Sequence, residues 1–255
     1  MNQNFRLPEI LRIARAQGKV TVEDLAAHFG VTVQTIRRDL SDLDNAGQLE
    51  RVHGGAILRS GTVNIAYRER RELNAGAKRA IARACAAAIP DGAAVFLAIG
   101  TTTEAVARNL IRHRGLLVAT NNINVANILA GAEGAQVVVT GGALRPADGG
   151  LTGPLAVQSV RAFKPDIAVI GASAVDGAGD VLDYDLAEVA VTQAILAQVR
   201  QGWLVADASK FQRAAPMRVC GLGDLDRVFS DAPLTPGLAT LCQASGTEVT
   251  VMGGD

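Results

Sequence analysis

The 255-residue sequence has few aromatic residues, few cysteines and no net charge. Phe, Trp and Tyr make up only 4% of it, although hydrophobic residues of all kinds make up 49%. A core dominated by Ala, Val, Leu and Gly suits α/β packing, in which small side chains let helices lie close on a parallel sheet. Because 25 basic residues balance 25 acidic ones, the overall charge gives no support to nucleic-acid binding. Any DNA-binding surface must come from local arrangement.

Signals for export, membrane insertion and metal binding are also lacking. The N-terminus has no apolar core of a signal peptide, and no hydrophobic run approaches the roughly 18 residues that a membrane span needs. The three cysteines, Cys85, Cys220 and Cys242, are scattered and form no Cys-x-x-Cys pair. We therefore expect a cytoplasmic protein with buried thiols, without a metal site or another cofactor.

Residues 1–59 are expected to form a domain of three short helices followed by a β-hairpin. Apolar residues recur at helical spacing from Leu7 to Ala14 and from Val22 to Phe29. Gly18 is expected to end the first helix, and Thr21 to cap the second together with Asp24. Thr32 is expected to cap the third helix, which ends at Gly47, and the strands 49–52 and 56–59 then flank a glycine-rich turn.

The third helix has an exposed face rich in hydrogen-bonding groups. With Ile36, Leu40 and Leu43 turned inward, Arg38 points directly away from the core. A helix-turn-helix places the N-terminal part of such a helix in the major groove, where Arg, Gln and hydroxyl groups contact base edges. We expect the DNA contacts to come from this helix and the hairpin, through Gln34, Thr35, Arg37, Arg38, Ser41, Arg51 and His53.

The alternative for these residues is an ordinary solvated face in a small helix bundle. Three helices, a tight turn and a hairpin occur together within this short segment, however, and the exposed face lacks the regular Glu–Lys pairs of a merely solvated helix. That combination favours DNA binding.

Residues 60–75 are polar and charged, and we interpret them as a linker. From residue 76 to residue 255 the pattern changes to helices that alternate with short apolar strands, which predicts a mostly parallel α/β sheet with helices on both faces. The expected strands are 94–98, 116–119, 136–139, 167–170, 204–206, 228–230 and 248–251, and the expected helices are 78–88, 103–111, 123–130, 155–163, 187–199 and 237–244.

Four polar clusters follow expected strands, and in open α/β sheets ligands bind at the carboxyl ends of strands. Backbone N–H groups at a helix N-terminus suit a phosphate, and a lysine adds a full charge. Acidic side chains farther along accept hydrogen bonds from substrate hydroxyls. The expected ligand-binding residues are Gly100, Thr101, Thr102, Thr103, Asn121, Asn122, Gly141, Gly142, Asp183, Asp185, Glu188 and Lys210. Each cluster alone is more often a helix cap, a turn or a surface loop, and it is their combination that favours an anion-binding pocket.

The run Thr35-Ile36-Arg37-Arg38-Asp39-Leu40, followed by Arg51-Val52-His53-Gly54-Gly55-Ala56, resembles the signature of the DeoR family of regulators. The resemblance extends through the second domain, on Ile99-Gly100-Thr101-Thr102, Thr120-Asn121-Asn122, Asp148-Gly149-Gly150 and Ser209-Lys210-Phe211. It implies a winged helix-turn-helix that binds paired operator half-sites as a homodimer or homotetramer. It also implies a sensor domain similar in fold to ribose-5-phosphate isomerase. Within the family the sensor is most similar to that of a repressor whose inducer is glycerol 3-phosphate.

A regulator that responds to a different sugar phosphate is one alternative, and an isomerase-like enzyme with a DNA-binding appendage is another. The isomerases carry an Asp-Gly-Ala-Asp type of segment where this sequence has Ile170-Gly171-Ala172-Ser173. Both acids are absent, and Glu188 alone makes a poor catalytic set, because isomerisation needs a general base and stabilisation of an enediolate. We therefore expect a transcriptional repressor and no enzyme.

Overall fold

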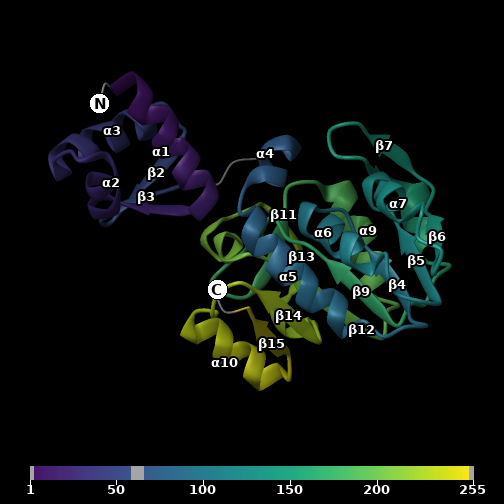
Figure 1. Cartoon of the computed structure of the whole chain (residues 1–255). Coiled ribbons are helices and arrows are strands. Elements are labelled where there is room, and N and C mark those ends of the chain that lie inside the picture. Colours follow the sequence, from purple (N-terminus) through teal and green to yellow (C-terminus); the bar gives the residue numbers. More distant parts are fainter. Residues whose placement is uncertain (1–2, 59–65, 253–255) are drawn as a thin grey trace.

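The computed structural model describes residues 3–58 and 66–252, and Figure 1 shows two parts joined near helix α4. The smaller, N-terminal part contains α1 (Gln3–Gln17), α2 (Val22–Phe29) and α3 (Val33–Asn45). It also contains a three-stranded antiparallel sheet of β1 (Lys19–Thr21), β3 (Gly55–Leu58) and β2 (Leu49–Val52), in that order. The sequence predicted the three helices and the hairpin, but it did not predict β1.

Local sequence fixes the ends of the N-terminal helices. The hydroxyl of Thr21 accepts a hydrogen bond from the Asp24 amide, and that of Thr32 accepts one from the Thr35 amide, so both expected caps are confirmed. Gly30 follows α2 with a φ of 62°, a left-handed conformation that glycine adopts without strain. These signals place α3 at a fixed turn from α2, as a helix-turn-helix requires.

A buried ion pair joins α1 to α3. The guanidinium of Arg6 donates from Nε to Asp39 Oδ2 at 2.5 Å and from Nη2 to Asp39 Oδ1 at 3.1 Å. Both side chains are almost completely buried, beside a core that includes Ile10, Ile36 and Leu40. The pair therefore sets how the third helix lies against the first.

The larger part is built on a seven-stranded parallel sheet with the order β15-β14-β12-β9-β4-β5-β6. Each of the seven strands lies where the sequence predicted one. Their bounds are β4 (Ala94–Leu97), β5 (Leu116–Thr120), β6 (Ala135–Val139), β9 (Ile167–Ile170), β12 (Gln201–Val205), β14 (Arg227–Ser230) and β15 (Glu248–Val251).

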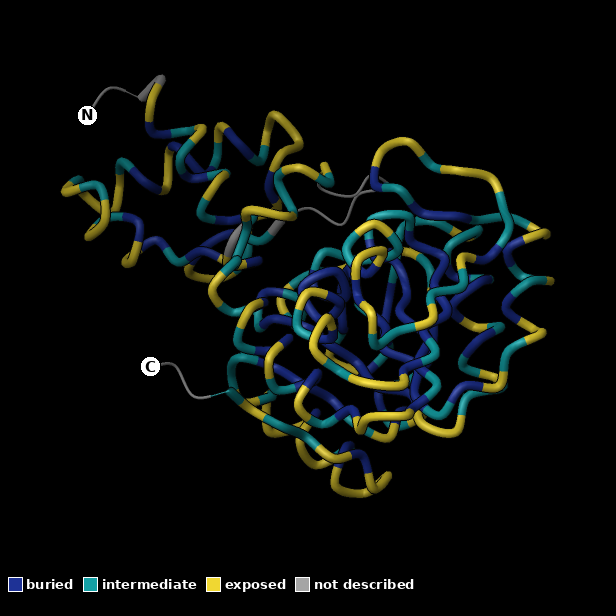
Figure 2. The backbone as a smooth tube through the Cα atoms, turned by 45° about the vertical axis from the view of Figure 1, so that its right-hand side comes forward, coloured by how far each residue is buried: buried dark blue, intermediate teal, exposed yellow. Residues whose placement is uncertain are grey.

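Helices cover both faces of this sheet, and Figure 2 shows the buried strands enclosed by partly exposed helices and loops. Val95 and Leu97 pack on the face covered by α5 (Ala75–Ala88), α6 (Thr101–Leu110) and α7 (Ile123–Leu129). The alternate residues, such as Phe96, pack on the face covered by α8 (Pro154–Val160), α9 (Leu186–Leu196) and α10 (Pro236–Ser245). A sheet buried on both faces explains why its strands read as continuous apolar runs.

Several short elements were not predicted. They are a hairpin of β7 (Ala143–Arg145) and β8 (Gly150–Thr152), a small antiparallel sheet of β10 (Ala174–Val175), β11 (Asp180–Asp183) and β13 (Met217–Gly221), and the 3-10 turns η1 (Ala208–Gln212) and η2 (Leu222–Asp224). Of these elements, β11 and η1 line the site described below through Asp183 and Lys210, and Arg145 of β7 contacts its Glu188.

The expected linker, residues 60–75, falls partly outside the described residues. Its described portion contains α4 (Tyr67–Glu72) and the first residue of α5. Helix α4 lies against the larger part, because Arg70 is ion-paired with Asp148 at 3.3 Å and Tyr67 donates to the carboxylate of Glu104 at 2.9 Å. Within residues 3–58 and 66–252, no helix has the length and apolar character required to cross a membrane.

Candidate functional site

The exposed face of α3 is the candidate nucleic-acid interface. Gln34, Arg37 and Arg38 are exposed there, and neither arginine forms an ion pair within the described part of the chain. Thr35 and Ser41 are half-buried, and the Thr35 hydroxyl shares a hydrogen bond of 2.9 Å with that of Thr32.

The hairpin lies beside this helix in sequence and adds further donors. Arg51 and His53 are exposed on β2 and on the two-residue turn between Val52 and Gly55. All seven residues predicted to contact DNA therefore belong to the small domain, with the side chains on α3 and the hairpin at least partly accessible.

The candidate ligand site lies where the strand order of the large sheet reverses. After β4 the chain adds β5 and β6 on one side, and then returns to place β9 on the other side of β4. At such a switch point the loops after the two central strands diverge and leave a crevice at the carboxyl edge of the sheet. A cleft lies there, lined by Arg70, Ile99, Gly100, Thr101, Thr102, Gly171, Ala172, Ser173, Asp183, Glu188 and Lys210.

One side of the cleft is suited to a phosphate group. Gly100 directly precedes α6 and has a φ of 150°. The first amide groups of a helix have no hydrogen-bond partner within that helix, so they can donate to a phosphate oxygen. The Nε atom of Arg70 is a buried donor without a hydrogen-bond partner among the described residues, and Lys210 adds an ammonium group. Burial lowers the pKa of Lys210 to about 7, and the nearby Arg213 contributes to this shift.

Two acidic side chains also line the cleft. Asp183 accepts a hydrogen bond from Ser173 Oγ at 3.1 Å, and burial raises its pKa, a shift that the nearby Arg70 and Lys210 oppose. Burial and the neighbouring Asp183 raise the pKa of Glu188 to about 7. Carboxyl groups accept hydrogen bonds from hydroxyls, so the cleft combines donors for an anion with acceptors for hydroxyl groups.

Arg145 holds Glu188 in place, together with Asp148 and Asp185. Its guanidinium donates to Asp148 at 2.8 Å, to Asp185 at 2.6 Å and to Glu188. Burial raises the pKa of Asp185, but hydrogen bonds from the Glu188 amide, the Arg145 side chain and the Ala187 amide outweigh it, so the pKa is lowered overall. The arginine lies on the β7–β8 hairpin, so the hairpin fixes the orientation of Glu188 in the cleft.

The structure brings together six of the predicted ligand-binding residues: Gly100, Thr101, Thr102, Asp183, Glu188 and Lys210. The other six lie outside the lining of the cleft and have structural contacts. Thr103 Oγ1 donates to the carbonyl groups of Ala98 and Gly100, and Asp185 caps α9. Asn122 caps α7, and Asn121 donates to the Leu151 carbonyl at 3.2 Å.

The remaining two, Gly141 and Gly142, pack against α8. A Cβ on Gly142 would lie 2.9 Å from the Cβ of Ala156, so this glycine is required for close packing.

Sequence reasoning missed four residues of the site: Arg70, Arg145, Asp148 and Ser173. Arg70 lies in the segment that we interpreted as a linker. Ser173 occupies the position at which the isomerases carry the second acid of their Asp-Gly-Ala-Asp segment. Asp148 was named only within the run Asp148-Gly149-Gly150 that carries the family resemblance. No local pattern marks Arg145, because its partners Asp185 and Glu188 are 40 and 43 residues away.

The cleft is narrow and is closed by elements that also contact the DNA-binding part. Its volume of about 20 Å³ has room for roughly one water molecule. Lys210 enters it from η1, and Arg70 enters it from α4. On the far side of η1, a Cβ built on Gly18 would lie 2.6 Å from the Cβ of Gln212, and Arg213 donates to the carbonyl of Arg15.

Comparison with known proteins agrees with both halves of the structure. The model of the DeoR-like helix-turn-helix domain matches residues 6–62, and that of the DeoR C-terminal sensor domain matches residues 73–232. The glycerol-3-phosphate regulon repressor of Escherichia coli K12 is 40% identical over 233 residues, which cover 91% of this chain and 92% of the relative. The repressor of the same name from Haemophilus influenzae is 39% identical over 255 residues, which cover 100% and 99%.

Among solved structures, ribose 5-phosphate isomerase A from Neisseria gonorrhoeae is similar at a TM-score of 0.39 and 15% sequence identity, over 52% of each chain.

Proposed function

The chain belongs to the DeoR family of transcriptional regulators, and from this premise we propose that it represses transcription until glycerol 3-phosphate releases it from operator DNA. The observation that carries the proposal is the cleft at the switch point, which combines phosphate donors with hydroxyl acceptors. The chain is a regulator and not an enzyme, because its curated relatives and both matching family models are those of transcriptional regulators.

The donors and acceptors that line the cleft match the functional groups of glycerol 3-phosphate. Its phosphate group fits at the N-terminus of α6, where Thr101 and Thr102 offer backbone amides and Lys210 and Arg70 offer charge-assisted hydrogen bonds. Its two hydroxyls fit against Asp183 and Glu188.

Because the cleft has room for about one water molecule, the ligand must displace Lys210 or Arg70 from their positions. The Lys210 segment contacts Gly18 and Arg15 of the DNA-binding part, and α4 contacts it through the Arg15–Glu69 ion pair at 3.1 Å. We propose that opening of the cleft shifts α1 through these contacts and so changes how the DNA-binding domain is presented. A coupling of ~1–3 kcal/mol between the two sites is typical of such a response.

A mobility-shift assay tests the proposal by monitoring release of an operator-carrying DNA fragment as glycerol 3-phosphate is added. Release at a concentration that matches the directly measured Kd supports the proposal. The main competing function is a response to another sugar phosphate, and a thermal-shift screen with a panel of phosphorylated metabolites identifies it, because a specific ligand raises the apparent stability. Failure of glycerol 3-phosphate alongside a clear response to another member of the panel would keep the sensor and discard the inducer.

On the DNA side, Arg38→Ala is expected to weaken binding to the specific operator by ~1–3 kcal/mol. Arg38 is exposed near the start of α3 and forms no ion pair among the described residues, so its guanidinium is free to contact a base edge. A mobility-shift titration at fixed salt measures the loss, and Arg161→Ala, an exposed arginine of the sensor domain, is the matched control. Wild-type affinity of Arg38→Ala would remove this residue from the DNA-reading face.

At pH 8, binding of glycerol 3-phosphate is expected to be accompanied by the uptake of close to one proton from solution. Burial holds the pKa of Lys210 at about 7, so its amine is largely neutral at pH 8, and a neighbouring phosphate dianion restores the charged form. Affinity therefore falls as the pH rises above 7, where the phosphate is already a dianion. Calorimetry in buffers of different ionisation enthalpy measures this uptake.

The control for the pH effect is Lys210→Arg, because arginine stays charged throughout this range. It should abolish most of the proton uptake while keeping a cation in the cleft. Equal proton uptake by both proteins would show that another group titrates.

We further propose that the protein acts in the cytoplasm, where its metabolite and its operator are both present, and that it binds paired half-sites as a homodimer or homotetramer. The division into residues 1–59, 60–75 and 76–255 remains our proposal for its domain organisation.

A further inference from the structure

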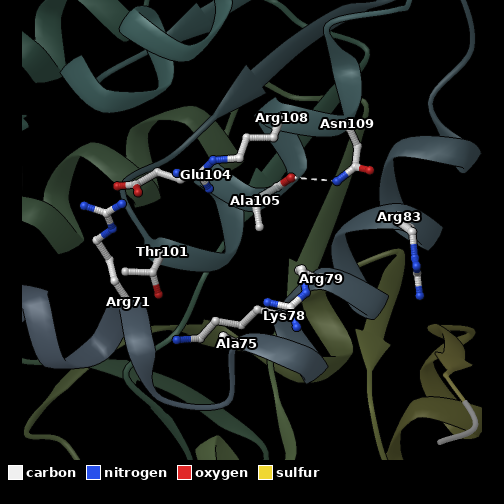
Figure 3. Close-up of a pocket in the computed structure, with 10 residues that line it drawn as sticks. All are labelled: Arg71, Ala75, Lys78, Arg79, Arg83, Thr101, Glu104, Ala105, Arg108 and Asn109. Carbon is white, nitrogen blue, oxygen red and sulfur yellow. Dashed lines mark hydrogen bonds between the residues drawn. The ribbon is translucent and has the colours of Figure 1, made fainter. Parts of the chain in front are cut away.

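A second cavity lies outside the candidate cleft, between helices α5 and α6, and we refer to it as the α5–α6 groove (Figure 3). Its volume is about 440 Å³, within the range typical of sites for small metabolites. Five of its ten lining residues are cationic, and these are Arg71, Lys78, Arg79, Arg83 and Arg108. Glu104 is the one acidic residue in the lining.

The carboxylate of Glu104 is the one negative charge in the lining, and it is held in place by neutral donors. It accepts hydrogen bonds from the Tyr67 hydroxyl at 2.9 Å and from Asn124 Nδ2 at 3.1 Å, and its side chain is buried. Across residues 3–58 and 66–252, the guanidinium groups of Arg79, Arg83 and Arg108 form no ion pair. The groove therefore presents five cationic residues against one carboxylate, which leaves an excess of positive charge.

This concentration of charge is local, because the chain as a whole has no net charge. Like charges that converge on a concave surface repel one another, and an anion that enters the groove removes this repulsion. Lys78 is only 6% exposed, and its ammonium group donates to the Arg70 carbonyl at the inner end of the groove. A ligand that reaches both Lys78 and the outer arginines must be small enough to enter between the helices.

The groove also has an apolar component, provided by Ala75 and Ala105. Figure 3 shows arginine and lysine side chains extending along the groove from both helices, so their aliphatic parts add to this surface. Five cations and one engaged carboxylate suit a ligand with two phosphate groups and a carbon skeleton better than a single phosphate, which carries at most two negative charges.

We propose that the α5–α6 groove binds an organic diphosphate as a second effector, at a site distinct from the switch-point cleft. Thr101 lines both cavities, so the two ligands would occupy opposite sides of the same helix N-terminus. Occupancy of one site then alters affinity at the other by a reciprocal factor. The proposal does not depend on which metabolite binds the cleft.

The test is calorimetric titration of the full chain with inorganic pyrophosphate at fixed ionic strength. Wild type should bind it with saturation and more tightly than orthophosphate. Arg79→Gln/Arg83→Gln should weaken binding at least ~10-fold, because charge-assisted hydrogen bonds are lost. These side chains are exposed, so the variant should keep the fold, which thermal unfolding checks.

Two controls make the result specific. Arg161→Gln removes one exposed arginine outside the groove, and Lys210→Ala, at a residue of the cleft that lies near Lys78, tests whether pyrophosphate binds in the cleft instead. Arg161→Gln should bind pyrophosphate as the wild type does, and Lys210→Ala should lose less affinity than Arg79→Gln/Arg83→Gln. No saturable binding by wild type, or an equal loss in Arg161→Gln, would overturn the proposal. So would a loss confined to Lys210→Ala, which would place pyrophosphate in the cleft, or a variant that loses operator affinity while pyrophosphate binding is unchanged.

Discussion

Lys210→Ala is expected to bind glycerol 3-phosphate at least ~10-fold more weakly than the wild type, since each ~1.4 kcal/mol is tenfold. Its ammonium group lies in the cleft beside the N-terminus of α6, where it adds a full charge to the backbone donors. Operator affinity without ligand should be nearly unchanged, since Lys210 contributes no side-chain contact to the DNA-binding face. The variant should therefore behave as a repressor that the inducer no longer releases.

The measurement pairs calorimetric titration with glycerol 3-phosphate and operator release for the same preparation. Loss of one cation should not unfold the sensor domain, because removal of Lys210 reduces repulsion with Arg70, Lys78 and Arg213 and so offsets the lost attraction to Asp207, which keeps its hydrogen bonds from Ser209 and Asn74. The matched control is Lys164→Ala, at an exposed lysine of the same domain, which should leave both readouts unchanged. Equal affinity of wild type and Lys210→Ala would rule out Lys210 as a phosphate ligand.

Breaking the Arg6–Asp39 pair should have the largest effect on stability. Asp39→Ala leaves the Arg6 guanidinium buried without its bidentate partner, and loss of one member of a buried pair costs ~3–5 kcal/mol. The small domain buries a modest core, so a loss of this size is comparable to its entire stability. We expect its thermal transition to be lost or lowered by many degrees, together with DNA binding, while the sensor domain stays folded.

A second variant keeps this prediction testable if the first fails to fold. Replacement of both partners by apolar residues, in Arg6→Met/Asp39→Leu, removes the buried charge and should recover most of the stability. Glu50→Gln, at an exposed carboxylate of the same domain, is the matched control and should change the transition little. If Asp39→Ala were as stable as the wild type, the ion pair would contribute nothing to the packing of α1 on α3.

Most of the fold could be predicted because its signals are local. The seven strands of the large sheet are short apolar runs in the sequence. Thr21 and Thr32 each cap the start of a helix with one hydroxyl group. The small strands carry no such signal, because β10 is only two residues long and β11 pairs with β13 across a long stretch of chain.

The candidate site could be predicted only in part, for the same reason. Thr101 and Lys210 follow strand ends and could be placed by topology. Arg145 gains its role from carboxylates about forty residues away, and Arg6 from an aspartate 33 residues away, neither of which is visible as a pattern. Asn122 belongs to a polar run typical of a ligand-binding loop. Its side chain instead caps α7, an alternative that the sequence left open.

The narrowness of the switch-point cleft has a consequence for how fast and how sensitively a regulator of this kind responds. If the ligand binds only to molecules in which Lys210 or Arg70 has moved aside, the apparent Kd equals the intrinsic Kd divided by the fraction of open molecules. The observed association rate would then level off at high ligand concentration, at the rate of opening. A substitution that loosens η1 would raise that fraction and lower the metabolite level at which genes switch on. Response threshold would thus be adjustable through packing at Gly18, without any change to a residue that touches the ligand.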